Sequence, residues 1–252
     1  MIPKKSKALL VSMTDFHPGI KSKLRPRKGA KKDTEKLHRA LTELNYKVEL
    51  HLDLDAKEIL ELYKRVATDE HGEYFVTVIS SHGENGFIYG YDGEAVRLAD
   101  IFTMFDPARC PQLANKPKIF FIQACRGSDL DDGVEVETDS VLPQEEDTFL
   151  QYLAIPIDTA VMFAASPGYA AFQNLAGSVF LQTLWKLLRG EERHLELLQL
   201  MTRINYFVAY EFEARGEYSG KKEMPCFVTK MIQNVFPFSN KTKDELMGLL
   251  KA

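Results

Sequence analysis

Cys125 is the residue of this sequence that is best placed for nucleophilic chemistry. It lies in the pentapeptide Gln-Ala-Cys-Arg-Gly (Gln123–Gly127), directly after an apolar run. His82, in the tripeptide Ser-His-Gly, precedes it by 43 residues. A thiolate is the nucleophile of cysteine enzymes, and a nearby histidine carries the proton. A lone cysteine is most often a small buried hydrophobe and a lone histidine a loop residue, but together the two features indicate a cysteine protease.

Alternating strands and helices are expected to position this pair. Short apolar runs predict buried strands at Ala8–Met13, Lys47–Leu52, Tyr74–Ser80, Lys118–Gln123, Ala160–Ala164 and Cys226–Met231. Helical spacing follows at Asp33–Leu44, Asp55–Ala67 (with an Asp-x-x-Glu start), Ser178–Leu188 and His194–Phe212. This order predicts an α/β fold with a largely parallel sheet that helices cover on both faces.

The carboxyl ends of two predicted strands bring the chemistry together. One strand ends just before His82 and another just before Cys125, so both side chains are expected at the edge where open parallel sheets bind ligands. Acyl transfer also needs backbone N–H donors, and Gly83 with Cys125 is expected to supply them. The segments Gly86–Tyr91 and Glu94–Val96, joined by Asp-Gly, predict a small hairpin.

Composition and charge limit the classes of protein to which this sequence can belong. The 252 residues are 45% apolar and 27% charged, with a net charge of -4, which is typical of a globular protein. Three cysteines make no disulfide framework and fit a reducing compartment, so we expect a cytoplasmic protein. No apolar run is long enough to span a membrane, no Cys/His spacing suits a metal, and no cofactor is expected. Nucleic-acid binding would rest only on the ten Lys/Arg of residues 1–32, and we expect no such partner.

The motifs together resemble a known family. They are Asp15-Phe16-His17, Arg27-Lys28-Gly29, Ser81-His82-Gly83 with Gly86 and Gly90, Lys116-Pro117-Lys118, Gln123–Gly127, Pro167-Gly168-Tyr169, Gly177-Ser178 with Phe180, and Met224-Pro225-Cys226. In this order, over residues 7–238, they are similar to the catalytic domain of a caspase, and most similar to the executioner type.

The resemblance implies a fold and a set of roles. The implied fold is a six-stranded, mostly parallel sheet flanked by helices, with the last strand at a dimer interface between like or related chains. The implied activity is that of an endopeptidase which cleaves after aspartate in apoptosis-type signalling. Cys125 would be the nucleophile, His82 the acid and base, and Gly83 with Cys125 the oxyanion hole. Arg27 and Gln123 match the positions that bind the substrate's P1 aspartate, the residue before the scissile bond.

The resemblance also divides the chain. Residues 1–252 form a single catalytic domain, with a large-subunit part at about 7–139, a linker at 140–157, a small-subunit part at 158–238 and a tail at 239–252. The linker begins within Val136-Glu137-Thr138-Asp139-Ser140, and the resemblance implies cleavage after Asp139. Asp147 and Asp158 are weaker candidates, and an acidic loop contains aspartates by composition alone.

The segment after Pro167-Gly168-Tyr169, which the resemblance implies is the substrate loop, departs from the family's pattern. Caspases carry an aromatic residue and an arginine after Pro-Gly-Tyr, and that arginine contacts the P1 carboxylate. Here the aromatic is Phe172, but the arginine position holds Gln173. A buried carboxylate needs charged donors, so activity is expected to be weakened. Three readings stay open: a weak protease, a protease with shifted preference, and a pseudoenzyme that regulates an active caspase by dimerising with it.

Overall fold

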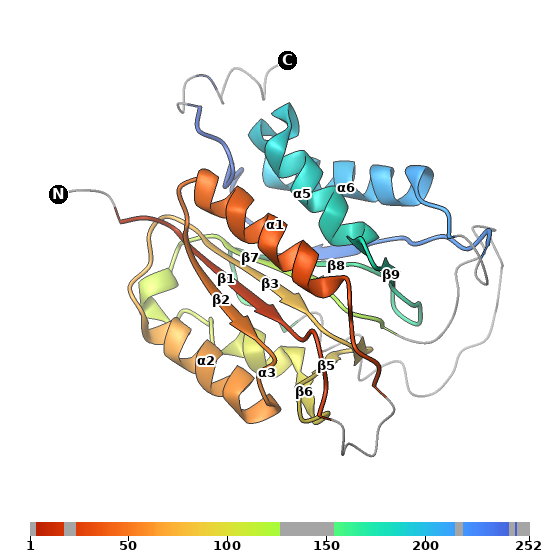
Figure 1. Cartoon of the computed structure of the whole chain (residues 1–252). Coiled ribbons are helices and arrows are strands. Elements are labelled where there is room, and N and C mark those ends of the chain that lie inside the picture. The colour runs from red at the N-terminus through yellow and green to blue at the C-terminus, as the bar shows by residue number, and fades with distance from the viewer. Residues whose placement is uncertain (1–3, 18–23, 127–153, 215–218, 242–244, 246–252) are drawn as a thin grey trace, which may run out of the picture.

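A six-stranded sheet lies at the centre of the protein (Figure 1). The computed structural model describes residues 4–17, 24–126, 154–214, 219–241 and 245. The sheet has the order β11-β8-β7-β3-β1-β2, and only the pairing of β11 with β8 is antiparallel. The strands are β1 (Lys7–Ser12), β2 (Lys47–Leu52), β3 (Phe75–Ser80), β7 (Lys118–Gln123), β8 (Thr159–Phe163) and β11 (Cys226–Thr229).

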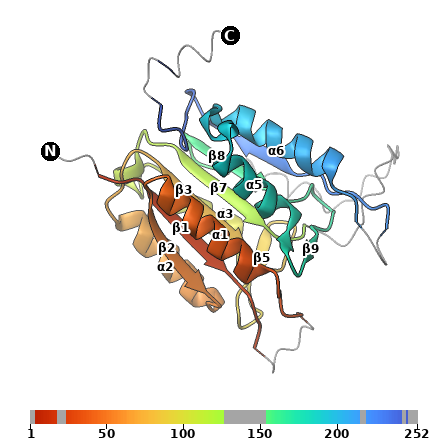
Figure 2. The same cartoon turned by 45° about the horizontal axis from the view of Figure 1, so that its top comes forward.

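Helices cover both faces of this sheet (Figures 1 and 2). The helices α1 (Ala30–Glu43), α5 (Val179–Arg189) and α6 (Leu197–Glu211) pack on one face. On the other face lie α2 (Ala56–Thr68) and α3 (Leu98–Thr103). The described residues also include two 3-10 turns, η1 (Pro111–Leu113) and η2 (Glu191–His194). The predicted α/β class and the six-stranded, mostly parallel sheet are therefore confirmed.

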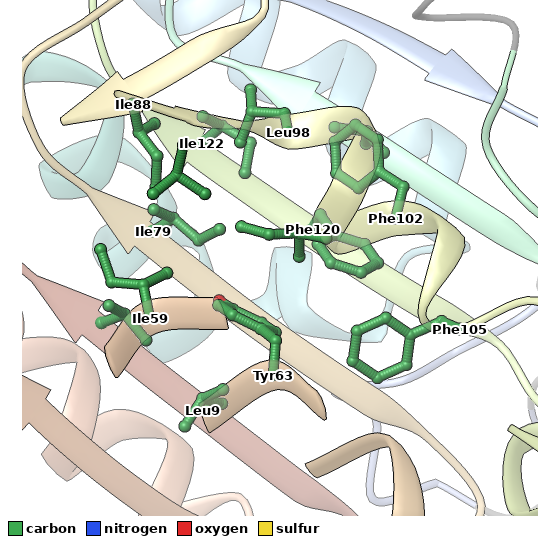
Figure 3. Packing of buried hydrophobic residues seen from close by; sticks show 14 of the residues in the cluster. Leu9, Ile59, Tyr63, Ile79, Ile88, Leu98, Phe102, Phe105, Phe120 and Ile122 are labelled. Carbon is green, nitrogen blue, oxygen red and sulfur yellow. The ribbon is translucent and has the colours of Figure 1, made fainter. Parts of the chain in front are cut away.

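Alternate residues of the central strands enter different cores. Leu9 and Phe120 pack with α2 and α3, whereas their neighbours Leu10 and Phe121 pack with α1, α5 and α6. Figure 3 shows the first core, in which Tyr63 of α2 lies near Phe105 and Phe120. Because both faces are buried, the central strands are continuous apolar runs, as in other parallel sheets.

The observed boundaries differ from the predicted ones mainly at helix starts. The strands agree to within two residues, and the capping box of Asp55 and Glu58 is present at the start of α2. The helix predicted from Asp33 begins at Ala30 instead, so that Asp33 is buried in its first turn. The segment predicted as one helix from His194 is divided: η2 ends at His194, and Glu196 caps α6 by accepting a hydrogen bond from Leu198 N.

Two small sheets lie beyond the carboxyl ends of the central strands (Figure 1). One contains β4 (Gly83–Glu84), β5 (Phe87–Tyr89) and β6 (Ala95–Arg97), and the antiparallel β5–β6 pair is the predicted hairpin. The other pairs β9 (Gln173–Asn174) with β10 (Gly177–Ser178). No helix in the described ranges is both long and apolar enough to cross a membrane.

Candidate active site

The strand register places His82 and Cys125 at equivalent positions. Ser80 at the end of β3 pairs with Gln123 at the end of β7, and each candidate follows two residues later. Both side chains line one cavity of about 450 Å³ at this end of the sheet. The cavity walls also include Arg27, Lys28, Gly29, Gln123, Ala171, Gln173, Asn174 and Leu175. The predicted convergence of thiol and imidazole on one edge of the sheet is therefore what the fold produces.

His82 is held in one orientation and one tautomer. Its Nε2 lies 2.8 Å from the backbone carbonyl oxygen of Arg25, and its ring packs against that of Phe16 with 5.1 Å between centroids. A carbonyl oxygen only accepts, so Nε2 carries the proton and Nδ1 is the basic nitrogen. Burial lowers the pKa of His82, and the positive charge of Arg27 acts in the same direction. A neutral imidazole is therefore available at neutral pH.

Gly83 and Cys125, the two residues expected to form the oxyanion hole, lie next to each other in the fold. Cys125 is partly exposed, and its Sγ lies 3.8 Å from the carbonyl oxygen of Ala171 in the substrate loop. His82 O accepts from Tyr89 N, so Gly83 opposite Ile88 is a non-hydrogen-bonded pair. The N–H of Gly83 therefore points away from β5 and remains available to a bound oxygen.

Arg27 is a buried cation at the cavity wall. Its Nη1 donates to the Met13 carbonyl oxygen at 2.8 Å and its Nη2 to Ser80 Oγ at 2.9 Å. Burial lowers the pKa of Arg27 to about 10, and the negative charge of the Asp33 carboxylate opposes that shift. The guanidinium therefore stays charged at neutral pH, and since it has five N–H donors, three remain for other acceptors.

Gln123 and Gln173 contribute buried polar atoms to the same cavity. The Oε1 atom of Gln123 and the Nε2 atom of Gln173 are buried, and neither has a hydrogen-bond partner among the described residues. A buried polar atom without a partner costs free energy, and such atoms are often satisfied by a bound ligand or water. Gln173 therefore offers a neutral donor at the position where the family's pattern has a charged one.

Two buried carboxyl groups that the sequence did not single out position the substrate loop. Asp33 of α1 accepts from Ser178 N at 2.7 Å and from Gln182 Nε2, which ties the loop's end to the segment carrying Arg27. Glu223 accepts from Phe172 N at 2.5 Å. Burial raises the pKa of Asp33, and it raises that of Glu223 to about 8. Nothing in the local sequence marks either residue, since both lie in ordinary polar stretches.

Other predicted positions lie apart from the cavity. Phe172 is not among the residues that line it, because its ring packs against Phe212 with 5.3 Å between centroids. Asp139, the expected cleavage position, and Asp147 lie outside the described residues. Asp158 is buried, with its backbone hydrogen-bonded to Lys118 and Lys230, which disfavours cleavage there. In the described part of the chain, no three His, Cys, Asp or Glu side chains are grouped to hold a metal ion.

Comparison with known proteins identifies the class. A family model described as the caspase domain matches residues 5–237. Caspase-3 of Xenopus laevis is 34% identical over 240 residues, which are 94% of this chain and 81% of that protein. Caspase-7 of Gallus gallus is 32% identical over 241 residues, covering 92% and 77%. The crystal structure of caspase-1 from Spodoptera frugiperda superposes with a TM-score of 0.81 at 27% identity, covering 95% of this chain and 94% of that one.

The fold and the family match define a cysteine-type peptidase domain. The chain belongs to the caspase family.

Proposed function

We propose that this protein is an endopeptidase that cleaves peptide bonds after aspartate, with Cys125 as nucleophile and His82 as proton carrier. The observation that carries the proposal is the placement of Cys125, His82 and Arg27 on the wall of one cavity, where Cys125 and His82 follow register-matched strand ends. A thiol beside a neutral imidazole supplies the nucleophile, and a buried guanidinium supplies an anchor for a carboxylate.

In the proposed reaction, His82, Cys125 and the neighbouring Gly83 carry the steps of bond cleavage. Nδ1 of His82 takes the thiol proton, and Cys125 Sγ attacks the carbonyl carbon of the scissile bond. Backbone N–H groups of Gly83 and Cys125 stabilise the oxyanion. The imidazolium returns its proton to the leaving amine, which departs and leaves a thioester on Cys125. Water then attacks the thioester with His82 as base, releasing the acid and the thiol.

Recognition of the P1 aspartate falls to Arg27 and Gln123, with Gln173 on the substrate loop, whereas Phe172 supports that loop by packing against Phe212. Loss of one partner of a buried charge pair costs about 2–5 kcal/mol. At about 1.4 kcal/mol per tenfold change, the absence of arginine at position 173 lowers kcat/KM by roughly thirty- to several-thousand-fold. We therefore propose a weakened protease of apoptosis-type signalling in the cytoplasm, with processing after Asp139.

A second candidate function is regulation of an active caspase by dimerisation. Gln173 favours this second function, because the loss of an arginine at this position weakens substrate binding while the fold stays intact. The edge strand β11 (Cys226–Thr229) supports it, since it pairs with β8 on one side only and its residues are half-buried. An edge strand pairs readily with another strand. In this reading β11 joins the same strand of a related caspase.

Kinetics with matched variants separate the two functions. Wild type, Cys125→Ala and Gln173→Arg are compared on a peptide with aspartate at P1. A working protease loses all turnover in Cys125→Ala and gains at least about thirtyfold in kcat/KM in Gln173→Arg. Absence of turnover in both wild type and Gln173→Arg would contradict it. The regulatory reading requires that addition of the Cys125→Ala protein changes the turnover of an active caspase.

A further inference from the structure

Charge is distributed unevenly over the cavity wall. Arg27 is its buried cation, and Gln173 is neutral. Lys28 lines the same cavity and is exposed. Lys28 therefore adds a second positive charge to the wall of this cavity.

The backbone of Lys28 is fixed against the substrate loop. A side chain at the neighbouring Gly29 would overlap the carbonyl oxygen of Asn174, so the two segments touch there. Gly29 O also accepts from Asp33 N, and Asp33 in turn binds Ser178 at the end of the loop. Lys28 is thus held beside Gln173 and Asn174 by contacts that do not use its own side chain.

The ammonium group of Lys28 is uncommitted. It forms no ion pair with any described residue, whereas other lysines of the protein, such as Lys7, pair with carboxylates. Lysine carries its charge as a compact group on a flexible stem, so it reaches an anion without the fixed geometry that arginine needs.

We propose that Lys28 is a specificity-determining residue, whose ammonium group supplies the second positive charge to the P1 carboxylate in place of an arginine at position 173. This inference rests on the proposed function. It implies that aspartate is preferred over the isosteric, neutral asparagine through Arg27 and Lys28 together. Because Lys28 lies at the exposed rim, its contribution is smaller and more sensitive to salt than that of a buried arginine.

The test uses two peptides that differ only in aspartate or asparagine at P1. Lys28→Gln is expected to lower kcat/KM for the aspartate peptide about tenfold, and for the asparagine peptide less than twofold. Lys28→Arg retains the wild-type ratio. Lys31→Gln is the matched control, since Lys31 is exposed on the same segment but does not line the cavity. It removes the same charge and is expected to leave the ratio within twofold.

Two results would overturn the role of Lys28. In the first, Lys28→Gln lowers kcat/KM for both peptides equally. In the second, Lys28→Gln leaves the ratio of the two kcat/KM values within twofold of wild type, as Lys31→Gln is expected to do. Binding keeps the inference separable from catalysis: both peptides are titrated calorimetrically into Cys125→Ala with and without Lys28→Gln. If Lys28→Gln abolishes the preference for the aspartate peptide in binding, the role of Lys28 is supported, even where wild type shows no turnover. Absence of turnover in wild type would refute the protease function but not the role of Lys28 in binding. Equal affinity of the two peptides for Cys125→Ala would refute the role of Lys28.

Discussion

Replacement of Glu223 by glutamine is expected to change how stability depends on pH. The Glu223 side chain is 1% exposed, Oε2 accepts from Phe172 N, and Oε1 has no partner among the described residues. Burial raises its pKa from 4.5 to about 8. The folded protein therefore binds more protons than the unfolded chain between these values, and the free energy of unfolding falls as pH rises through that window.

The magnitude follows from the two pKa values. Between pH 5 and pH 8, deprotonation of Glu223 removes on the order of 3 kcal/mol from the free energy of unfolding. Glutamine keeps an acceptor for Phe172 N and does not titrate. The Glu223→Gln variant is thus expected to gain stability relative to wild type by this amount as pH rises from 5 to 8.

Urea denaturation at pH 5, 6, 7 and 8 measures this difference. Contributions of other titrating groups, such as His82, cancel because both proteins share them. Glu213→Gln is the control, since Glu213 is exposed, and its stability relative to wild type is expected to be nearly independent of pH. Parallel stability curves for wild type and Glu223→Gln would refute the reasoning and show that Glu223 is charged when folded.

Two further substitutions probe the geometry of the site. Gly83→Ala would place a Cβ 2.5 Å from the Phe87 carbonyl oxygen, so β4 must shift. The value of kcat/KM is expected to fall at least a hundredfold, which is on the order of the loss of one oxyanion donor. Wild-type kinetics in this variant would contradict the assignment of Gly83 to the oxyanion hole. Ser178→Ala removes the acceptor for Leu181 N at the start of α5. The free energy of unfolding, measured by urea titration, is expected to fall by about 1 kcal/mol. An unchanged midpoint of the titration would show that the helix cap is dispensable.

Local patterns in the sequence were sufficient for the main elements. The apolar run Lys118–Gln123 predicts β7 because a strand buried on both faces has no polar alternation. Asp55 and Glu58 predict the start of α2 because a capping box satisfies free N–H groups within four residues. Short elements such as α3 (Leu98–Thr103) have too few residues to establish a period.

The candidate site depends on contacts between distant segments, which local patterns do not reveal. His82 and Cys125 were found from their local motifs, Ser-His-Gly and Gln-Ala-Cys-Arg-Gly, and the register of β3 and β7 in the structure aligns them. Asp33 and Glu223 were missed because a polar residue near a helix start or in a turn is usually solvated, and only the folded chain brings them to the substrate loop. The importance of Gln173 came from the family resemblance rather than from its neighbours.

The central claim is that Cys125 is a nucleophile activated for attack on a P1-aspartate substrate. Intact mass measurement after incubation with a P1-aspartate peptidyl halomethyl ketone tests it most directly. We predict a single adduct, on Cys125, and no adduct in Cys125→Ala. The other two cysteines, buried Cys110 and half-buried Cys226, serve as internal controls. No adduct, or an adduct on Cys226 instead of Cys125, would contradict the account.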